Sequence, residues 1–169
     1  MTDSPSKSNI HVVVDLDGTI CNNSERAKAL DVKSAISWKT FFEKCESDQP
    51  IEPILNWIQL LGEICNIDII TGRPDYVRKQ TIAWLKTHDI RFDTLWMRKS
   101  SDTMKSSEYK AIKLKQLTEL FPDDQFVLAF EDDEQCIEMY KESGLTVIDP
   151  KPFTSNRDVG SDLSQVENP

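Results

Sequence analysis

The sequence predicts an α/β fold: a three-layer sandwich with a central parallel sheet and helices on both of its faces. Two observations support this class. Short runs of β-branched residues alternate with amphipathic segments of helical period, which is the pattern of parallel strands joined by helical crossovers. Three predicted strands also run directly into polar residues, which are Asp15 and Asp17, Thr71 and Arg73, and Asp132 and Asp133. Ligands of such sheets bind beyond the carboxyl ends of the strands, so these side chains predict a site for a charged ligand.

The first strand is predicted over residues 10–16, a β-branched run typical of a buried central strand. Gly18 follows it and permits the sharp turn needed there. Residues 21–50 are less regular and predict a small helical cap, or flap, inserted after this strand. In the cap, Trp38, Phe41 and Phe42 stand at helical spacing, and we expect Trp38 to pack against the core.

Beyond the cap, helices and strands alternate. Helices are predicted over 51–63, 75–87, 107–121 and 134–143, and strands over 64–70, 94–97, 126–130 and 145–148. The helix at 107–121 is expected to begin at a serine cap, Ser106 or Ser107. Its inward residues are expected to be Tyr109, Ile112, Leu117 and Leu120. One domain is therefore expected over 10–150, between a flexible N-terminus at 1–9 and a loose polar tail at 151–169.

Composition narrows the class of protein. With 38% hydrophobic and 29% charged residues, the chain resembles a soluble globular protein, and no apolar run reaches membrane-spanning length. Four scattered cysteines and a polar N-terminus without a signal peptide predict free thiols in a reducing cytoplasm. The net charge is −9, yet residues 73–115 carry 11 basic and 5 acidic side chains. This basic segment either attracts an anion or forms solvated helix faces.

Asp15 and Asp17 carry the most specific chemical signal. They are two residues apart, so on an extended segment they point to the same side. Two carboxylates on one side repel each other unless a cation lies between them or one holds a proton. A hard divalent cation, Mg²⁺, meets that need. A calcium-binding EF-hand loop that starts at Asp15 is excluded, because it needs a glycine at its sixth position and a glutamate at its twelfth. Here Gly18 is at the fourth position and the twelfth residue is Arg26.

The polar strand ends, taken in order, resemble a known family. Together with a lysine near a helix start, the motifs Asp15-Leu16-Asp17-Gly18-Thr19, Thr71-Gly72-Arg73 and Asp132-Asp133 resemble the haloacid dehalogenase (HAD) superfamily of aspartate-nucleophile phosphatases. More narrowly, the chain resembles the phosphatase half of phage-type polynucleotide kinase/3′-phosphatases. The features that carry this likeness are Trp38…Phe41-Phe42…Pro50, Ile70-Thr71-Gly72-Arg73, Met97-Arg98 and Ser106…Lys110. The resemblance covers about 10–150 and implies a Rossmann-like sheet; no P-loop of a kinase half is found.

The resemblance implies catalytic roles for four residues. Asp15 would attack phosphorus and form an aspartyl-phosphate. Asp17 would protonate the leaving oxygen and later activate water. Thr71 would donate a hydrogen bond to the phosphate, and Lys110 would neutralise the nucleophile and the phosphate oxygens.

The resemblance also implies a metal site and a substrate site. Mg²⁺ would be held by Asp15, by the backbone carbonyl of Asp17 and by Asp132, with Asp133 supporting this shell. Residues expected to contact the substrate are Gly72, Arg73 and Arg98.

One motif departs from the family pattern. An Asp usually lies four residues before the motif lysine in polynucleotide phosphatases, whereas this chain has Ser106 there and Asp102 further upstream. The lysine itself has two rivals, Lys105 and Lys113. Spacing and the family resemblance favour Lys110.

The expected function is therefore a Mg²⁺-dependent phosphomonoesterase acting on nucleic-acid 3′-phosphate ends or on nucleotides. A phosphatase of small metabolites, such as sugar phosphates, is an alternative that the acidic net charge favours. A non-catalytic interaction protein, binding partners through the acidic C-terminal part, is a second alternative. His11 and His88 suit neither a hydrolase triad nor a zinc site, so we expect them to be structural or exposed.

Overall fold

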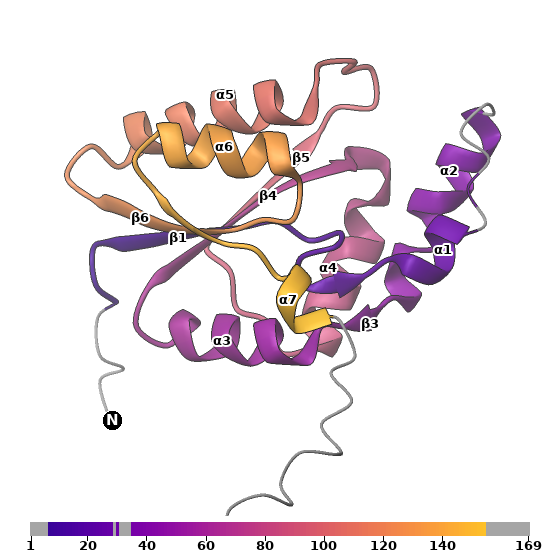
Figure 1. The fold of residues 1–169 in the computed structure, drawn as a ribbon, viewed down its shortest axis with the longest axis horizontal. Helices are drawn as coiled ribbons and strands as arrows, with labels where there is room; N and C mark the ends of the chain where they lie inside the picture. Colours follow the sequence, from indigo (N-terminus) through magenta and orange to yellow (C-terminus); the bar gives the residue numbers. More distant parts are fainter. Residues whose placement is uncertain (1–6, 29, 31–34, 155–169) are drawn as a thin grey trace, which may run out of the picture.

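The computed structural model describes residues 7–28, 30 and 35–154. Its centre is a five-stranded parallel sheet with the order β5-β4-β1-β6-β7 (Figure 1). The strands are β1 (Ile10–Val14), β4 (Asn66–Pro74), β5 (Thr94–Arg98), β6 (Gln125–Phe130) and β7 (Thr146–Ile148). The predicted α/β class and all five predicted strands are confirmed. The chain passes from β1 to one side of the sheet and later crosses to the other, so the carboxyl end of β1 lies where the connections diverge.

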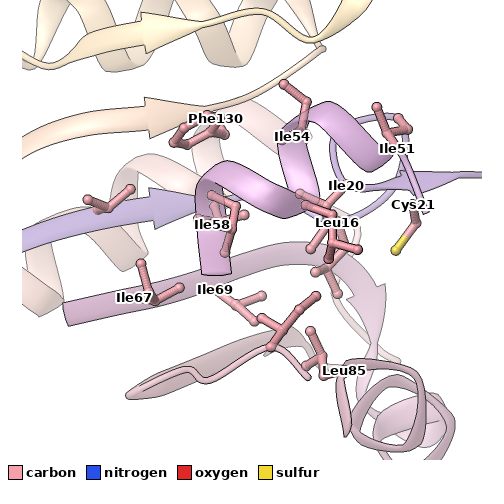
Figure 2. Close-up of a cluster of buried hydrophobic side chains, with 14 of the residues drawn as sticks. Leu16, Ile20, Cys21, Ile51, Ile54, Ile58, Ile67, Ile69, Leu85 and Phe130 are labelled. Carbon is pink, nitrogen blue, oxygen red and sulfur yellow. The ribbon is translucent and has the colours of Figure 1, made fainter. Parts of the chain in front are cut away.

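Helices cover both faces of the sheet (Figure 1). Val12 and Val14 of β1 belong to one apolar cluster and Val13 to the other, as the alternation of a strand requires. Figure 2 shows the first cluster, in which Ile54 and Ile58 of one helix lie among side chains of the sheet such as Phe130, Ile67 and Ile69. Its helices are α3 (Glu52–Gly62) and α4 (Arg78–Thr87), the latter preceded by the short 3-10 helix η2 (Asp75–Val77). The second cluster is covered by α5 (Ser106–Leu120) and α6 (Glu134–Glu142).

A small cap follows β1, as predicted. It consists of β2 (Cys21–Asn22), α1 (Ser24–Lys28), α2 (Ala35–Glu43), η1 (Cys45–Ser47) and β3 (Gln49–Pro50). The antiparallel pairing of β2 with β3 was not predicted from the sequence. Trp38 of α2 keeps 42% of its surface exposed, so the expectation that it packs against the core was wrong.

Helix α5 has its predicted position, and Tyr109 and Leu117 are buried as predicted, but the rest of its inward face differs. Ile112 and Leu120 are exposed, whereas Leu114 and Lys110 are buried. The buried face of the helix differs from the face that the apolar pattern predicts, because it includes Lys110, whose amino group contacts Asp15 directly after β1. The predicted serine cap is also wrong: Lys105 occupies the cap position, and its side chain makes no capping hydrogen bond.

The chain ends and the cysteines add three observations. Of the predicted C-terminal tail, residues 151–154 form a short helix, α7 (Lys151–Thr154), while 155–169 and residues 1–6 of the N-terminus lie outside the described residues. All four cysteines are buried free thiols, as predicted. Among the described residues, no helix is both long and apolar enough to cross a membrane.

His11 lies at the end of β1 remote from the polar strand ends. It is buried between Asp68 and Asp124, with Nδ1 2.6 Å from Asp68 Oδ2 and Nε2 2.9 Å from Asp124 Oδ2. Its ring also stacks on Phe126. The structural role expected for His11 is confirmed.

Candidate active site

The loop after β1 places the first two acidic residues. The Asp15 N–H donates to the Phe130 carbonyl (3.0 Å), which continues the pairing of β1 with β6 by one residue. The chain then turns sharply, with Gly18 at φ +83°. A Cβ on Gly18 would lie 2.3 Å from Asp132 Oδ2. Glycine is therefore required here both for the left-handed backbone and for the close approach of the Asp132 carboxylate.

Asp15 is buried and shares a lysine with a second buried carboxylate. Lys110 Nζ lies 3.0 Å from Asp15 Oδ1 and 2.5 Å from Glu131 Oε2. Val14 and Phe130 are partners in the β1–β6 register, so the residues that follow them emerge side by side at the sheet edge. Burial raises the pKa of Asp15, and the charge of Lys110 only partly offsets it.

The charges of this group are strongly coupled. Burial and the nearby charge of Asp15 raise the pKa of Glu131 to about 8. Burial disfavours the Lys110 ammonium, yet the charges of Asp15 and Glu131 outweigh this and raise the pKa of Lys110 well above its ordinary value. The lysine is therefore held as a cation directly beside Asp15.

Asp132 completes a cluster of three carboxylates. It accepts a hydrogen bond from Thr19 Oγ1 (3.1 Å), and burial together with the charge of Asp15 raises its pKa to about 6. One carboxylate oxygen from each of Asp15, Glu131 and Asp132 lies within 4.8 Å of the other two. Burial disfavours the ionised forms of these three carboxylates, and a bound cation would stabilise them. A hard divalent cation prefers such closely spaced oxygen ligands.

Asp17 turns to a different set of partners. Its Oδ1 accepts hydrogen bonds from Arg73 Nε (3.0 Å) and Nη2 (2.5 Å), and from Arg26 Nη2. Burial raises the pKa of Asp17, but the two guanidinium groups outweigh it and leave the pKa below its ordinary value. Asp15 and Asp17 line one cavity, as their two-residue spacing predicts, but the Asp17 carboxylate lies outside the cluster of Asp15, Glu131 and Asp132.

Arg26 and Arg73 join the cap to the sheet through a second aspartate. Asp48 accepts from Arg26 Nε (2.8 Å) and Nη2 (2.7 Å) and lies 3.4 Å from Arg73 Nη2. The Arg26 guanidinium also sits 4.1 Å from the centre of the Phe41 ring. Arg73, which the sequence assigns to the substrate, is completely buried, and its guanidinium is bound to Asp17. Two arginines and two aspartates thus form one neutral network that fixes Asp17.

A cavity of about 410 Å³ opens over these groups. The predicted residues that line it are Asp15, Asp17, Thr71, Gly72, Arg98, Lys110, Asp132 and Asp133; Glu131, Trp38 and Phe42 line it as well. Thr71 Oγ1 accepts the Arg73 N–H (3.2 Å), which leaves the Thr71 hydroxyl proton to donate elsewhere. Among the described residues, Nε and Nη2 of Arg98 are buried without a hydrogen-bond partner, and this guanidinium lies 5.3 Å from the Tyr109 ring centre.

Comparison with known proteins identifies the family. A family model described as the polynucleotide kinase PNKP phosphatase domain matches residues 9–152. The chain belongs to this family. The resemblance to HAD phosphatases that the motifs predicted is therefore confirmed. No curated protein matches the sequence.

Solved structures share the fold of this PNKP phosphatase domain. A chain of the Pnkp1/Rnl/Hen1 complex superimposes with a TM-score of 0.68 at 22% identity, covering 88% of this chain and 48% of that one. The present chain thus spans about half the length of that relative. A haloacid dehalogenase-like hydrolase from Streptococcus pneumoniae gives a TM-score of 0.59 at 14% identity, covering 83% and 84% of the two chains. The HAD-hydrolase YfnB from Bacillus subtilis, solved bound to magnesium, gives 0.55 at 14% identity, covering 81% and 86%.

The remaining lysine candidates lie outside this PNKP-type site. Lys105 is exposed at the start of α5. Lys113 Nζ lies over the Trp96 ring, 5.1 Å from its centre, and donates to Gln116 Oε1. Among these lysines, Lys110 is the one that contacts Asp15.

The acidic motif after β6 is used differently from the expectation. Glu131, for which the sequence analysis predicted no role, contacts Lys110, whereas Asp133 caps α6 by accepting the Cys136 N–H (3.0 Å). Ser106, which stands where the family pattern has an aspartate, lines the cavity, and Glu131 is a carboxylate partner of Lys110 here. The signal that could have identified Glu131 is its position, one residue after the strand, which matches that of Asp15.

Proposed function

We propose that the chain is a Mg²⁺-dependent phosphomonoesterase that forms an aspartyl-phosphate on Asp15 and acts on nucleic-acid 3′-phosphate ends or on nucleotides. The observation that carries this proposal is the contact of Lys110 with Asp15 and Glu131, next to Asp132, in one cavity. A buried nucleophile, a fixed cation and spare acidic oxygens are the elements that phosphoryl transfer needs.

The cluster of Asp15, Glu131 and Asp132 fits Mg²⁺ because its carboxylate oxygens lie close together. Burial raises the pKa of Asp132, so its ionised form is disfavoured unless a cation is bound. We assign the metal to Asp15, Asp132 and the backbone carbonyl of Asp17. Glu131 binds Lys110, and Asp133 binds the first turn of α6. In this proposal both residues hold the neighbouring metal ligands in place and are not ligands themselves. When bound, Mg²⁺ would neutralise charge on the phosphate and lower its repulsion from Asp15.

The first step is attack of an Asp15 carboxylate oxygen on phosphorus. The Asp15–phosphorus bond forms as the bond to the leaving oxygen breaks, and that oxygen takes a proton from Asp17. Lys110 and the Thr71 hydroxyl stabilise the phosphate oxygens. In the second step Asp17, now ionised, accepts a proton from the water that hydrolyses the aspartyl-phosphate.

The arginine network orients Asp17 for both steps. By lowering the pKa of Asp17 it favours the ionised form that accepts the proton in the second step, so the first step draws on the small protonated fraction. Arg26 and Arg73 bind only Oδ1 of Asp17, and Oδ2 has no hydrogen-bond partner among the described residues. One oxygen thus fixes the orientation while the other is left to exchange the proton. Arg73 is accordingly a positioning residue in this proposal, and Arg98 and Gly72 remain the groups assigned to the substrate.

A small-metabolite phosphatase is the second candidate, favoured by the net charge of −9, which weakens the attraction of a long polyanion. Polynucleotide binding should weaken steeply as salt rises, whereas binding of a compact metabolite should change little. We place either activity in the cytoplasm, on the ground that all four cysteines are unpaired thiols.

The decisive experiment is phosphate release from a panel of a 3′-phosphorylated oligonucleotide, nucleoside monophosphates and sugar phosphates, with Mg²⁺ or with EDTA. We expect Mg²⁺-dependent release that is greatest for the oligonucleotide and is lost in Asp15→Asn. Release from no compound, or equal release by Asp15→Asn, would refute the proposal. Release from no compound would favour the non-catalytic interaction protein.

A further inference from the structure

We propose that Trp38 stacks on the nucleobase at the phosphorylated end of the substrate, so that the cap supplies a base-binding surface to the catalytic cavity. This inference rests on the proposed phosphatase function, since it names what the phosphate is attached to. It favours a nucleotide or nucleic-acid end over a sugar phosphate.

The first observation is the position and exposure of Trp38. It lines the same cavity as Asp15 and Lys110. The indole contacts Phe42 (centroids 6.0 Å apart, interplanar angle 27°) and Phe41 (5.6 Å, 75°), yet 42% of its surface stays exposed. A large aromatic surface left open at the mouth of a polar cavity is a typical contact for a ligand.

The second observation is that this surface is anchored to the chemistry. Phe41 is buried and packs under the Arg26 guanidinium, 4.1 Å away, and Arg26 binds both Asp17 and Asp48. The aromatic group of α2 therefore has a fixed place relative to the proton-transferring residue. A base stacked on Trp38 would hold its phosphate in register with Asp15, which is the benefit that positioning gives to catalysis.

The third observation is size. The cavity volume of about 410 Å³ lies within the range of roughly 300–1,000 Å³ that is typical of small-molecule sites. A phosphate fills a small part of that space, and a ribose and a base can occupy the remainder. Base–aromatic stacking is tolerant of sequence because every base offers a π-face, so this contact would suit an end-processing enzyme that meets all four bases.

The test compares two substrates, a 3′-phosphorylated dinucleotide and the same molecule with an abasic terminal residue. Trp38→Ala should raise KM for the first by about tenfold, with kcat changed less than about twofold, and leave both constants for the abasic substrate unchanged. Trp38→Phe should retain most of the affinity. Trp57→Ala is the matched control, because Trp57 is equally exposed (44%) but lies on α3, outside the residues that line the cavity, and it should leave KM unchanged.

A binding measurement separates this inference from the proposed function. In Asp15→Asn protein, the dinucleotide should quench tryptophan fluorescence, and an added Trp38→Phe substitution should abolish the quench. Equal effects of Trp38→Ala on both substrates, or an unchanged quench without Trp38, would overturn the inference. If the wild-type protein releases phosphate from neither substrate, the proposed function fails, and the quench alone then decides whether Trp38 binds a base.

Discussion

Replacing Lys110 by methionine tests the link between the stability of the domain and its chemistry. The lysine is 2% exposed and lies 3.0 Å from Asp15 and 2.5 Å from Glu131. Removing one partner from such a buried group leaves two carboxylates unpaired and costs about 3–5 kcal/mol of the free energy of unfolding. For a chain of this length each kcal/mol lowers Tm by about 2–4 °C, so we expect Tm to fall by about 6–20 °C.

The loss should depend on pH. Without the ammonium the pKa values of Asp15 and Glu131 rise further above their unfolded values, so the penalty grows as pH rises and both groups are forced to ionise. The difference in Tm between Lys110→Met and the wild type should therefore be larger at pH 8 than at pH 5.5, as measured by calorimetry without metal. Phosphate release should fall by about 10²–10³-fold. Lys113→Met, one helical turn away, should cost less than about 1 kcal/mol.

Equal stability of Lys110→Met and the wild type, or an equal loss in Lys113→Met, would refute this reasoning. The same conclusion would follow from a penalty that shrinks as pH rises, since it would mean that the lysine does not balance the two carboxylates.

Three further predictions concern the rest of the site. Gly18→Ala should lose about 1–3 kcal/mol of stability and most of the activity, because its Cβ would meet the Asp132 carboxylate. Gly144→Ala is the control: φ there is +89° but nothing lies within 4 Å, so its loss of stability in thermal melts should come from backbone strain alone. Because the pKa of Asp132 is raised to about 6 and Mg²⁺ needs the ionised form, the Mg²⁺ affinity measured by calorimetry should fall as pH drops through 6, with proton release on binding. Asp132→Asn should lower the affinity and reduce the pH dependence to the part that Asp15 carries. Arg26→Met should raise the pKa of Asp17, because one of the two guanidinium groups that lower it is removed. The pH–rate profile would report this as a shift to higher pH of the limb that Asp17 controls, and an unmoved limb would contradict the role of the network.

Much of the fold follows from local patterns in the sequence. Apolar runs marked the five strands of the parallel sheet, because buried parallel strands need continuous apolar segments. Helix α5 was placed correctly, and Tyr109 and Leu117 are buried as predicted, but its apolar pattern wrongly counted Ile112 and Leu120 as inward and gave no sign that Lys110 is buried. A buried charge that faces a partner on another strand leaves no signal in the apolar period of its own helix.

The site was predictable only where strand ends define it. Asp15 was identified from its place after β1, and the same argument applied to Glu131 would have identified it, because Val14 and Phe130 are register partners. Choosing between Glu131 and Asp133 requires knowing where β6 ends and α6 begins. Arg26 and Asp48 could not be predicted, because they lie 22 residues apart in an irregular cap and meet only in the folded chain.

The central claim is that Asp15 becomes covalently phosphorylated, and rapid acid quenching tests it most directly. An oligonucleotide with a radiolabelled 3′-phosphate would be mixed with protein and Mg²⁺ and quenched within milliseconds. We expect label to precipitate with the wild-type protein and to be absent in Asp15→Asn. Phosphate release without any protein-bound label, or label that persists in Asp15→Asn, would contradict the account.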